Sequence, residues 1–100
     1  MYVVGARVTF PNELTKQSIK SYMTSELEGM NKMIMSFKID TSPTQHLVIN
    51  AFPSKKHADA FNNSIKDKVQ QIHELGIKVE RFEGKTLDFY LSIADVGELK

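Results

Sequence analysis

The stretch MNKMIMSFKIDTSPTQHLVINAF, residues 30–52, decides the fold of this chain because it holds two strand patterns joined by a turn. From Met33 to Ile39 apolar and polar residues alternate, which is the period of a strand with one buried face. DTSPTQ, residues 40–45, is typical of a turn. HLVINAF, residues 46–52, is apolar on both faces and favours a strand inside a sheet. The two strands are therefore expected to form an antiparallel hairpin.

A strand pattern and a helix pattern precede the hairpin. Residues 2–10 alternate as a strand does, and Pro11 ends that pattern. Asn12 is a good N-cap residue, and apolar residues then recur at helical spacing over residues 14–30. The sequence therefore predicts a strand and a helix before the hairpin.

The chain after the hairpin repeats this arrangement. Ser54 is expected to cap a second helix whose apolar stripe ends at Gly76. IKVERFE, residues 77–83, predicts a fourth strand, and TLDFYLSI, residues 86–93, predicts a fifth. The order βαββαβ predicts a ferredoxin-like α+β sandwich with an extra C-terminal strand, as a single domain over residues 1–100.

Composition excludes several classes of function. The chain has 100 residues, a formal net charge of +1 and no cysteine. This charge gives no basic face for nucleic acid, and the missing cysteine removes disulfides and thiolate catalysis. No apolar run is long enough for a membrane helix, and the three histidines show no metal-site spacing. We expect a cytoplasmic protein with no metal, no cofactor, no nucleic-acid partner and no membrane.

Two helices can cover only one face of the sheet, so the other face needs another partner. The helix-facing side is expected to carry Val4, Ala6, Val8, Met33, Met35, Phe37, Leu47, Ile49 and Ala51. The far side is then expected to carry Val3, Arg7, Ile34, Ser36, Lys38, His46, Val48, Asn50 and Phe52. Because that mixed face is too apolar for water, we expect a homodimer with its sheets packed face to face. The expected contacts at this dimer interface are Val3, Ile34, Val48 and Phe52.

The chain also resembles a known group. The matching features are the strand that ends at Phe52 before Pro53 and Ser54, the helix over 58–61, and the strand that reaches 82–84. In these and in the order of elements, it is similar to the dimeric α+β barrel superfamily. That superfamily includes the antibiotic-biosynthesis monooxygenase-like proteins and small uncharacterised families. The resemblance implies a homodimer and a ligand pocket in each subunit between helices and sheet.

Methionines and aromatic residues are the candidates for that pocket. Unbranched, polarizable thioethers fill an irregular core, and the same property lets a wall adapt to apolar ligands. The expected ligand-binding residues of this apolar kind are Met23, Met33, Met35, Phe37 and Phe61. Both interpretations, ordinary core and ligand wall, remain open at the level of sequence.

Lys55, Lys56 and His57 fall in the first turn of the second helix, where the helix dipole disfavours cations. Two lysines beside unpaired amides form a candidate seat for a ligand carboxylate, and the alternative is ordinary surface charge.

Two functions follow from these patterns. The first is a protein that binds a small apolar or aromatic molecule, with or without a carboxylate. The second is a cofactor-free monooxygenase or isomerase acting on such a compound. Its candidate catalytic residues are Tyr22, His46, Asn50 and His57. A third alternative is an oligomerisation module without a ligand.

Overall fold

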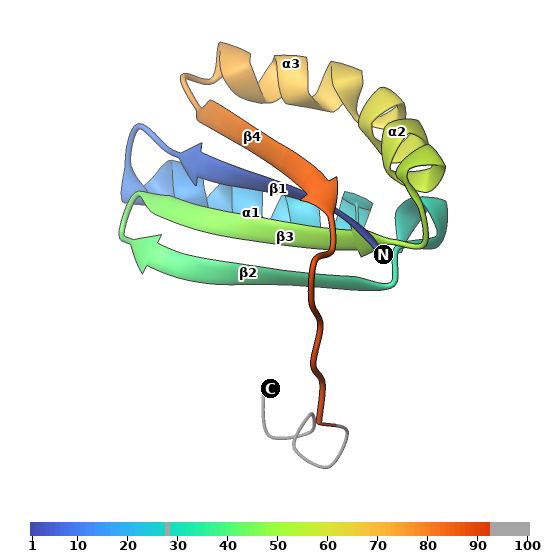
Figure 1. Cartoon of the computed structure of the whole chain (residues 1–100). Coiled ribbons are helices and arrows are strands. Elements are labelled where there is room, and N and C mark those ends of the chain that lie inside the picture. Colours follow the sequence, from blue (N-terminus) through green and yellow to red (C-terminus); the bar gives the residue numbers. More distant parts are fainter. Residues whose placement is uncertain (28, 93–100) are drawn as a thin grey trace.

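The computed structural model describes residues 1–27 and 29–92, and of residues 22–27 it describes the backbone alone. The main elements alternate as the sequence predicts, with a central hairpin flanked on both sides by helix and strand (Figure 1). In chain order they are β1 (Tyr2–Thr9), α1 (Glu13–Leu27), the short turn η1 (Met30–Lys32), β2 (Met35–Ser42), β3 (Gln45–Phe52), α2 (Lys55–Ser64), α3 (Lys66–Glu74) and β4 (Lys78–Lys85).

The four strands form one antiparallel sheet in the order β2-β3-β1-β4. Strand β1 lies between β3 and β4, and the predicted hairpin pairs β2 with β3. The register places Val4 opposite Asn50, Ala6 opposite Val48 and Val8 opposite His46. Since opposite residues of antiparallel strands point to the same face, this register fixes which side chains meet the helices.

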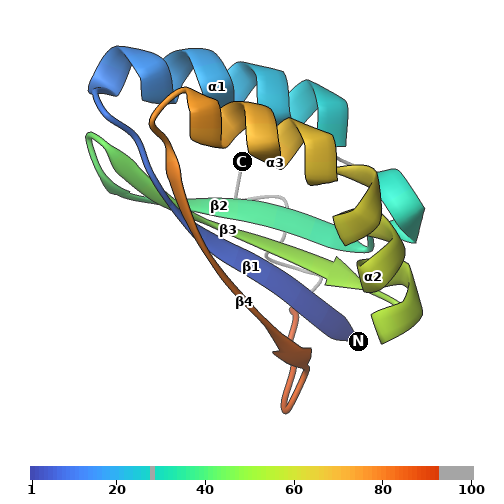
Figure 2. The same cartoon turned by 90° about the horizontal axis from the view of Figure 1, so that it is seen from above.

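The helices cover one face of the sheet, as Figure 2 shows from above. Asn12 begins α1, because its Oδ1 accepts a hydrogen bond from the backbone N–H of Thr15 at 2.8 Å. Ser54 caps α2 by accepting from the N–H of His57 at 3.5 Å. Gly76 ends α3 with a positive φ of 82°, which glycine adopts without steric cost. These three predicted helix boundaries are confirmed.

The expected single helix between Ser54 and Gly76 is instead two helices that meet at Ile65. Ile65 has a φ of −99° and a ψ of 3°, so the backbone bends there while the side chain stays buried. The bend turns α2 and α3 toward different parts of the sheet. One buried cluster therefore gathers under α2, from Val4, Phe52, Ala58, Phe61 and Ile65, and another under α3, from Phe10, Ile72 and Ile77.

The expected assignment of the two faces is wrong for β2 and β3. Phe52 is fully buried and its ring packs against Phe61 of α2 at 5.0 Å between centroids, so it belongs to the helix side. Val48 and Ser36 face the same side. Val48 and Phe52 are therefore not contacts of the far face. Both faces of β3 are apolar, so alternation within that strand does not identify the side that meets the helices.

The side of the sheet away from the helices is named here the open face. By the register its apolar residues are Val3, Met35, Phe37, Ile39, Leu47, Ile49 and Phe82. Arg7 keeps its expected place on this face, opposite Glu80 of β4. Phe37, Ile39 and Phe82 are 44–47% exposed. Val3 keeps its expected place on this face, and Ile34, just before β2, is 57% exposed. The open face is thus more apolar than the sequence pattern predicts.

The expected fifth strand is not present among residues 86–92. These residues leave the end of β4 as an extended segment, named here the C-terminal arm (Figure 1). The N–H of Thr86 donates to the carbonyl of Met1 at 2.9 Å. Beyond it Leu87 is 101% exposed, and Phe89 and Leu91 are each 50% exposed. An apolar alternating segment is therefore left outside the four-stranded sheet.

Candidate functional site

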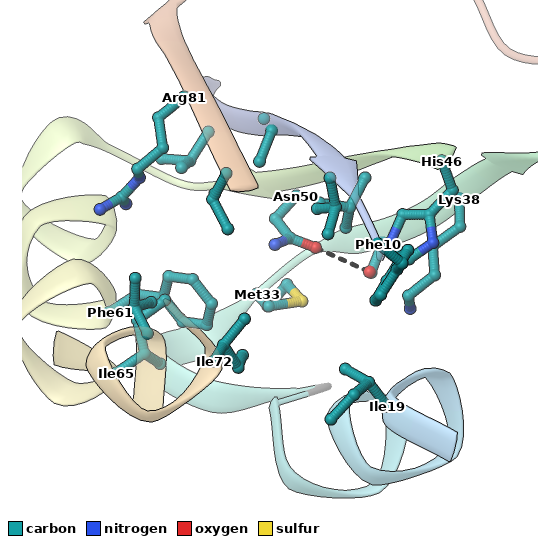
Figure 3. A pocket seen from close by; sticks show the side chains of 18 residues that line it. Phe10, Ile19, Met33, Lys38, His46, Asn50, Phe61, Ile65, Ile72 and Arg81 are labelled. Atoms are coloured by element: carbon teal, nitrogen blue, oxygen red, sulfur yellow. Dashed lines mark hydrogen bonds between the residues drawn. The ribbon is translucent and has the colours of Figure 1, made fainter. Parts of the chain in front are cut away.

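A cavity of about 100 Å³ lies between the sheet and the helices (Figure 3). Its floor comes from the sheet, and its roof comes from α1, α2 and α3. The residues that line it are Val4, Gly5, Ala6, Val8, Phe10, Ile19, Met33, Ser36, Lys38, His46, Val48, Asn50, Phe61, Ile65, Val69, Ile72, Val79 and Arg81. Most of these side chains are apolar, and none of the described lining residues is acidic.

Polar groups enter the cavity from the sheet. Ser36 of β2 and Asn50 of β3 lie opposite each other in register, and the Ser36 hydroxyl donates to Asn50 Oδ1 at 2.7 Å (Figure 3). His46 lies further along β3, toward the end of the cavity where Phe10 is found. The cavity thus has an apolar body with a few convergent polar groups, which is the usual form of a small-molecule site.

His46 is only 8% exposed, and its ring lies 5.2 Å from the ring of Phe10. Burial lowers the pKa of His46, and the nearby charges of Lys16 and Lys38 lower this pKa further. Because the ordinary histidine pKa is about 6.5, the imidazole is neutral at pH 7. A neutral ring facing a cavity is able to accept a proton.

Lys16 fixes α1 to the β2–β3 hairpin beside His46. The Lys16 side chain is 10% exposed, and its Nζ donates to the carboxylate of Asp40. The same Nζ donates to the carbonyl of Ser42 at 2.5 Å and to the carbonyl of Gln45 at 3.2 Å. The hydrogen bond from Lys16 lowers the pKa of Asp40. This contact closes one end of the helix–sheet sandwich.

The structure separates the expected ligand-binding residues. Met33 and Phe61 line the cavity. Met35 and Phe37 lie on the open face by the register of β2, so they do not line this cavity with Met33. The side chain of Met23 lies outside the described part of the chain. The sequence pattern puts Met33 and Met35 on one face because it treats residues 33–39 as a single regular strand. In the structure β2 begins only at Met35, and Met33 lies before it.

Lys55 and Lys56 do not reach the cavity. Lys55 Nζ lies 2.9 Å from Asp59 Oδ2 one helical turn along α2, and this hydrogen bond raises the pKa of Lys55. Lys56 is exposed. The pair therefore lies on the surface of α2, and the cavity lining contains neither lysine.

Of the catalytic candidates, His46 and Asn50 face the same cavity. His57 does not line it, since its Nδ1 lies 2.8 Å from the hydroxyl of Ser54 at the cap of α2. The side chain of Tyr22 lies outside the described part of the chain. Sequence reasoning missed Ser36 and Val48 as cavity residues, although Asn50 stands out as a polar residue within the apolar strand β3.

The described residues hold no group of three or more metal-binding side chains. No described helix has the length and apolar character that crossing a membrane requires.

Comparison with known proteins finds likeness in structure alone. No family model and no curated protein matches the sequence. A Deinococcus radiodurans protein provisionally named an antibiotic biosynthesis monooxygenase matches 93% of this chain and 99% of its own, with a TM-score of 0.76 and 4% identity. A dimeric ferredoxin-like protein from an uncultured marine organism matches 92% of this chain and 100% of its own, with a TM-score of 0.69 and 11% identity.

A third similar structure is a protein of unknown function from Nitrosomonas europaea, with a TM-score of 0.66 and 12% identity over 91% of this chain and 95% of the other. The chain therefore has the fold of the dimeric α+β barrel proteins, as the sequence resemblance predicts. At these identities the likeness establishes the fold and no activity.

Proposed function

We propose that this chain binds a small, largely apolar molecule in the cavity between the sheet and the helices. The observation that carries the proposal is the lining itself, which surrounds a space with apolar side chains and brings Ser36, His46 and Asn50 to it. A well-packed core of this size contains few voids larger than a water molecule. Apolar walls favour the uptake of apolar ligands, and a few polar groups fix the orientation of the ligand.

The size of the cavity limits the ligand. Its volume of about 100 Å³ is below the roughly 300–1,000 Å³ of sites for drug-sized ligands. A dry cavity of about 150 Å³ holds benzene in another protein, so the ligand here is a compound with a single small ring or a short branched chain. Met33 gives this wall room to adapt, since the thioether chain changes shape at low cost.

Thermal unfolding in the presence of small apolar compounds tests this proposal. A ligand of the native state raises the melting temperature by mass action. The variant Ala6→Leu fills the cavity from its floor and should remove the shift. Ala60→Leu is the matched control, because Ala60 lies on the exposed side of α2. A shift that survives in Ala6→Leu would place the ligand elsewhere, and no shift with any compound would reject the proposal.

The alternative function is that of a cofactor-free monooxygenase or isomerase. The observation in its favour is that neutral His46 and Asn50 face one cavity, as a proton acceptor and a hydrogen-bond donor. Mass spectrometry of a bound compound after incubation in air separates the two functions. Turnover that His46→Gln abolishes while binding persists would support the enzyme, and recovery of the compound unchanged would support binding alone.

We also propose that two copies of the chain form a homodimer through the open face. Phe37, Ile39 and Phe82 form an apolar surface there, and patches of this kind on soluble proteins mark contact sites. The C-terminal arm adds exposed apolar residues next to the same sheet. A structurally similar marine protein is described as dimeric, which supports a dimer here.

Analytical ultracentrifugation tests the dimer. Ile39→Glu places a carboxylate within the apolar surface of the proposed contact, where it would lose much of its water. The variant should sediment as a monomer, while Leu14→Glu on α1, 74% exposed, should leave the dimer intact. A monomeric wild-type protein at tens of micromolar would refute the homodimer.

A further inference from the structure

The Ser36–Asn50 pair is a partly buried polar pair in the floor of the cavity. The two residues face each other across β2 and β3, and Asn50 also lies opposite Val4 of β1. The Ser36 hydroxyl donates to Asn50 Oδ1 at 2.7 Å. The acceptor side of the amide is therefore occupied within the protein, and the amide is held in one orientation.

The donor side of the same amide is turned to the cavity. Figure 3 shows the Asn50 nitrogen on the side away from the dashed bond, toward the part of the cavity that Phe61 and Arg81 border. Among the described residues, none accepts a hydrogen bond from this nitrogen. Of the two cations that line the cavity, Arg81 lies on this side and donates to Asn62 of α2, and Lys38 lies on the other side with His46. A partly buried N–H without an acceptor is a place where a ligand atom gains a hydrogen bond.

We propose that the ligand is an uncharged compound with a carbonyl or ether oxygen, and that this oxygen accepts a hydrogen bond from Asn50 Nδ2. This inference rests on the proposed function and adds the chemical class of its ligand. Ser36 is a positioning residue, since it holds the amide with its N–H groups toward the ligand. The apolar body of the ligand lies among Met33, Phe61 and Ile72.

Charged ligands fit this position less well. A cation has no acidic partner among the described lining residues. A carboxylate at Asn50 would be desolvated between Val4, Val48 and Phe61. Lys38 and Arg81 also line the cavity, but Arg81 already donates to Asn62, and Lys38 also has an interaction partner within the chain. Lys55 and Lys56, which the sequence predicts as a carboxylate site, lie on the outside of α2. The lining therefore selects an uncharged acceptor.

Three probes of equal heavy-atom count separate these chemistries. They are cyclopentanone, methylenecyclopentane, in which a CH₂ group replaces the oxygen, and butyrate. Nitrogen-15 NMR titrations give the dissociation constant of each and follow the side-chain NH₂ of Asn50 directly. Cyclopentanone should bind roughly three- to tenfold more tightly than methylenecyclopentane, which is the usual net effect of one hydrogen bond. Cyclopentanone alone should move the Asn50 NH₂ signals.

Two variants assign the preference to the pair. Asn50→Leu keeps the approximate shape and removes the donor, so both cyclic probes should bind with equal affinity. Ser36→Ala should reduce the preference without abolishing it, because the amide loses the contact that orients it. In the wild-type protein, a shift of the Asn50 NH₂ signals with cyclopentanone alone tests the same hydrogen bond without any substitution.

The outcomes distinguish this inference from the proposed function. If methylenecyclopentane binds in the cavity and cyclopentanone binds no better, the hydrogen bond to Asn50 is refuted while apolar binding stands. Tightest binding by butyrate would also overturn the inference, in favour of an anion site. If none of the probes binds, the proposed function itself fails and the inference falls with it.

Discussion

Phe52→Ala should be among the most destabilising single substitutions in this chain. Phe52 is fully buried, and its ring packs against that of Phe61 at 5.0 Å in the cluster under α2. Truncation of a buried phenylalanine to alanine costs about 3–5 kcal/mol, from lost burial and the cavity that remains. A domain of this size has about 5–15 kcal/mol of stability, so the variant should keep a small part of it.

Urea unfolding followed by circular dichroism measures this loss. With a slope of about 2 kcal/mol per molar urea, a loss of 4 kcal/mol lowers the midpoint by roughly 2 M. Phe37→Ala is the matched control on the open face, where the ring is 44% exposed. It should lower the midpoint far less and weaken the dimer instead. If Phe52→Ala dissociates the dimer and leaves the unfolding midpoint within about 0.5 M, the two faces of β3 have been assigned wrongly.

Three further substitutions test other contacts. Lys16→Met should lower the free energy of unfolding by about 1–3 kcal/mol, because Asp40 and the carbonyls of Ser42 and Gln45 lose the hydrogen bonds from Lys16, although Gln45 keeps the one from Thr41. A loss below about 0.5 kcal/mol in urea would contradict this. His46 has a folded-state pKa below the unfolded value of about 6.5, so its contribution to stability is complete above that pH and is lost as pH falls through the folded pKa. Melting temperatures from pH 8 to pH 5 should therefore decline less in His46→Phe than in the wild type, and equal declines would exclude His46 as the cause. Leu91→Glu should weaken the dimer in sedimentation more than Tyr90→Glu, since alternate residues of the C-terminal arm face opposite ways; equal effects would show that the arm makes no ordered contact.

The order of elements was predictable because its signals are local. Asn12, Ser54 and Gly76 mark helix boundaries through their own backbone and side-chain chemistry, and the structure confirms all three. The hairpin of residues 35–52 is equally local, since two alternating segments joined by a short turn have few other ways to pair.

The assignment of faces failed because it depends on distant contacts. Residues 46–52 are apolar at odd and even positions alike, so hydrophobicity does not decide between the two sides. Phe61 and Val4 decide it, by packing with Phe52 from other elements. Ser36 and Asn50 share a face in the expected and in the observed assignment alike, so their hydrogen bond does not decide between the two sides.

The fifth strand shows a second limit. Residues 86–92 carry the alternation of a strand, and the described chain offers them no strand to pair with beyond the bond from Thr86 to Met1. A strand needs a neighbour for its backbone groups, and the proposed neighbour is a second copy of the chain. Sequence pattern predicts the tendency to pair and leaves the partner unspecified.

Methyl NMR of methionine-labelled protein tests the central claim, binding inside the cavity, most directly. Met33 lines the cavity, whereas Met35, two residues later, lies on the open face, so the two methyl groups report on opposite sides of the same sheet. Titration with cyclopentanone should shift the Met33 methyl signal in a saturable manner and leave that of Met35 unchanged. Saturable shifts at Met35 with none at Met33, or no saturable shift at either, would contradict the account.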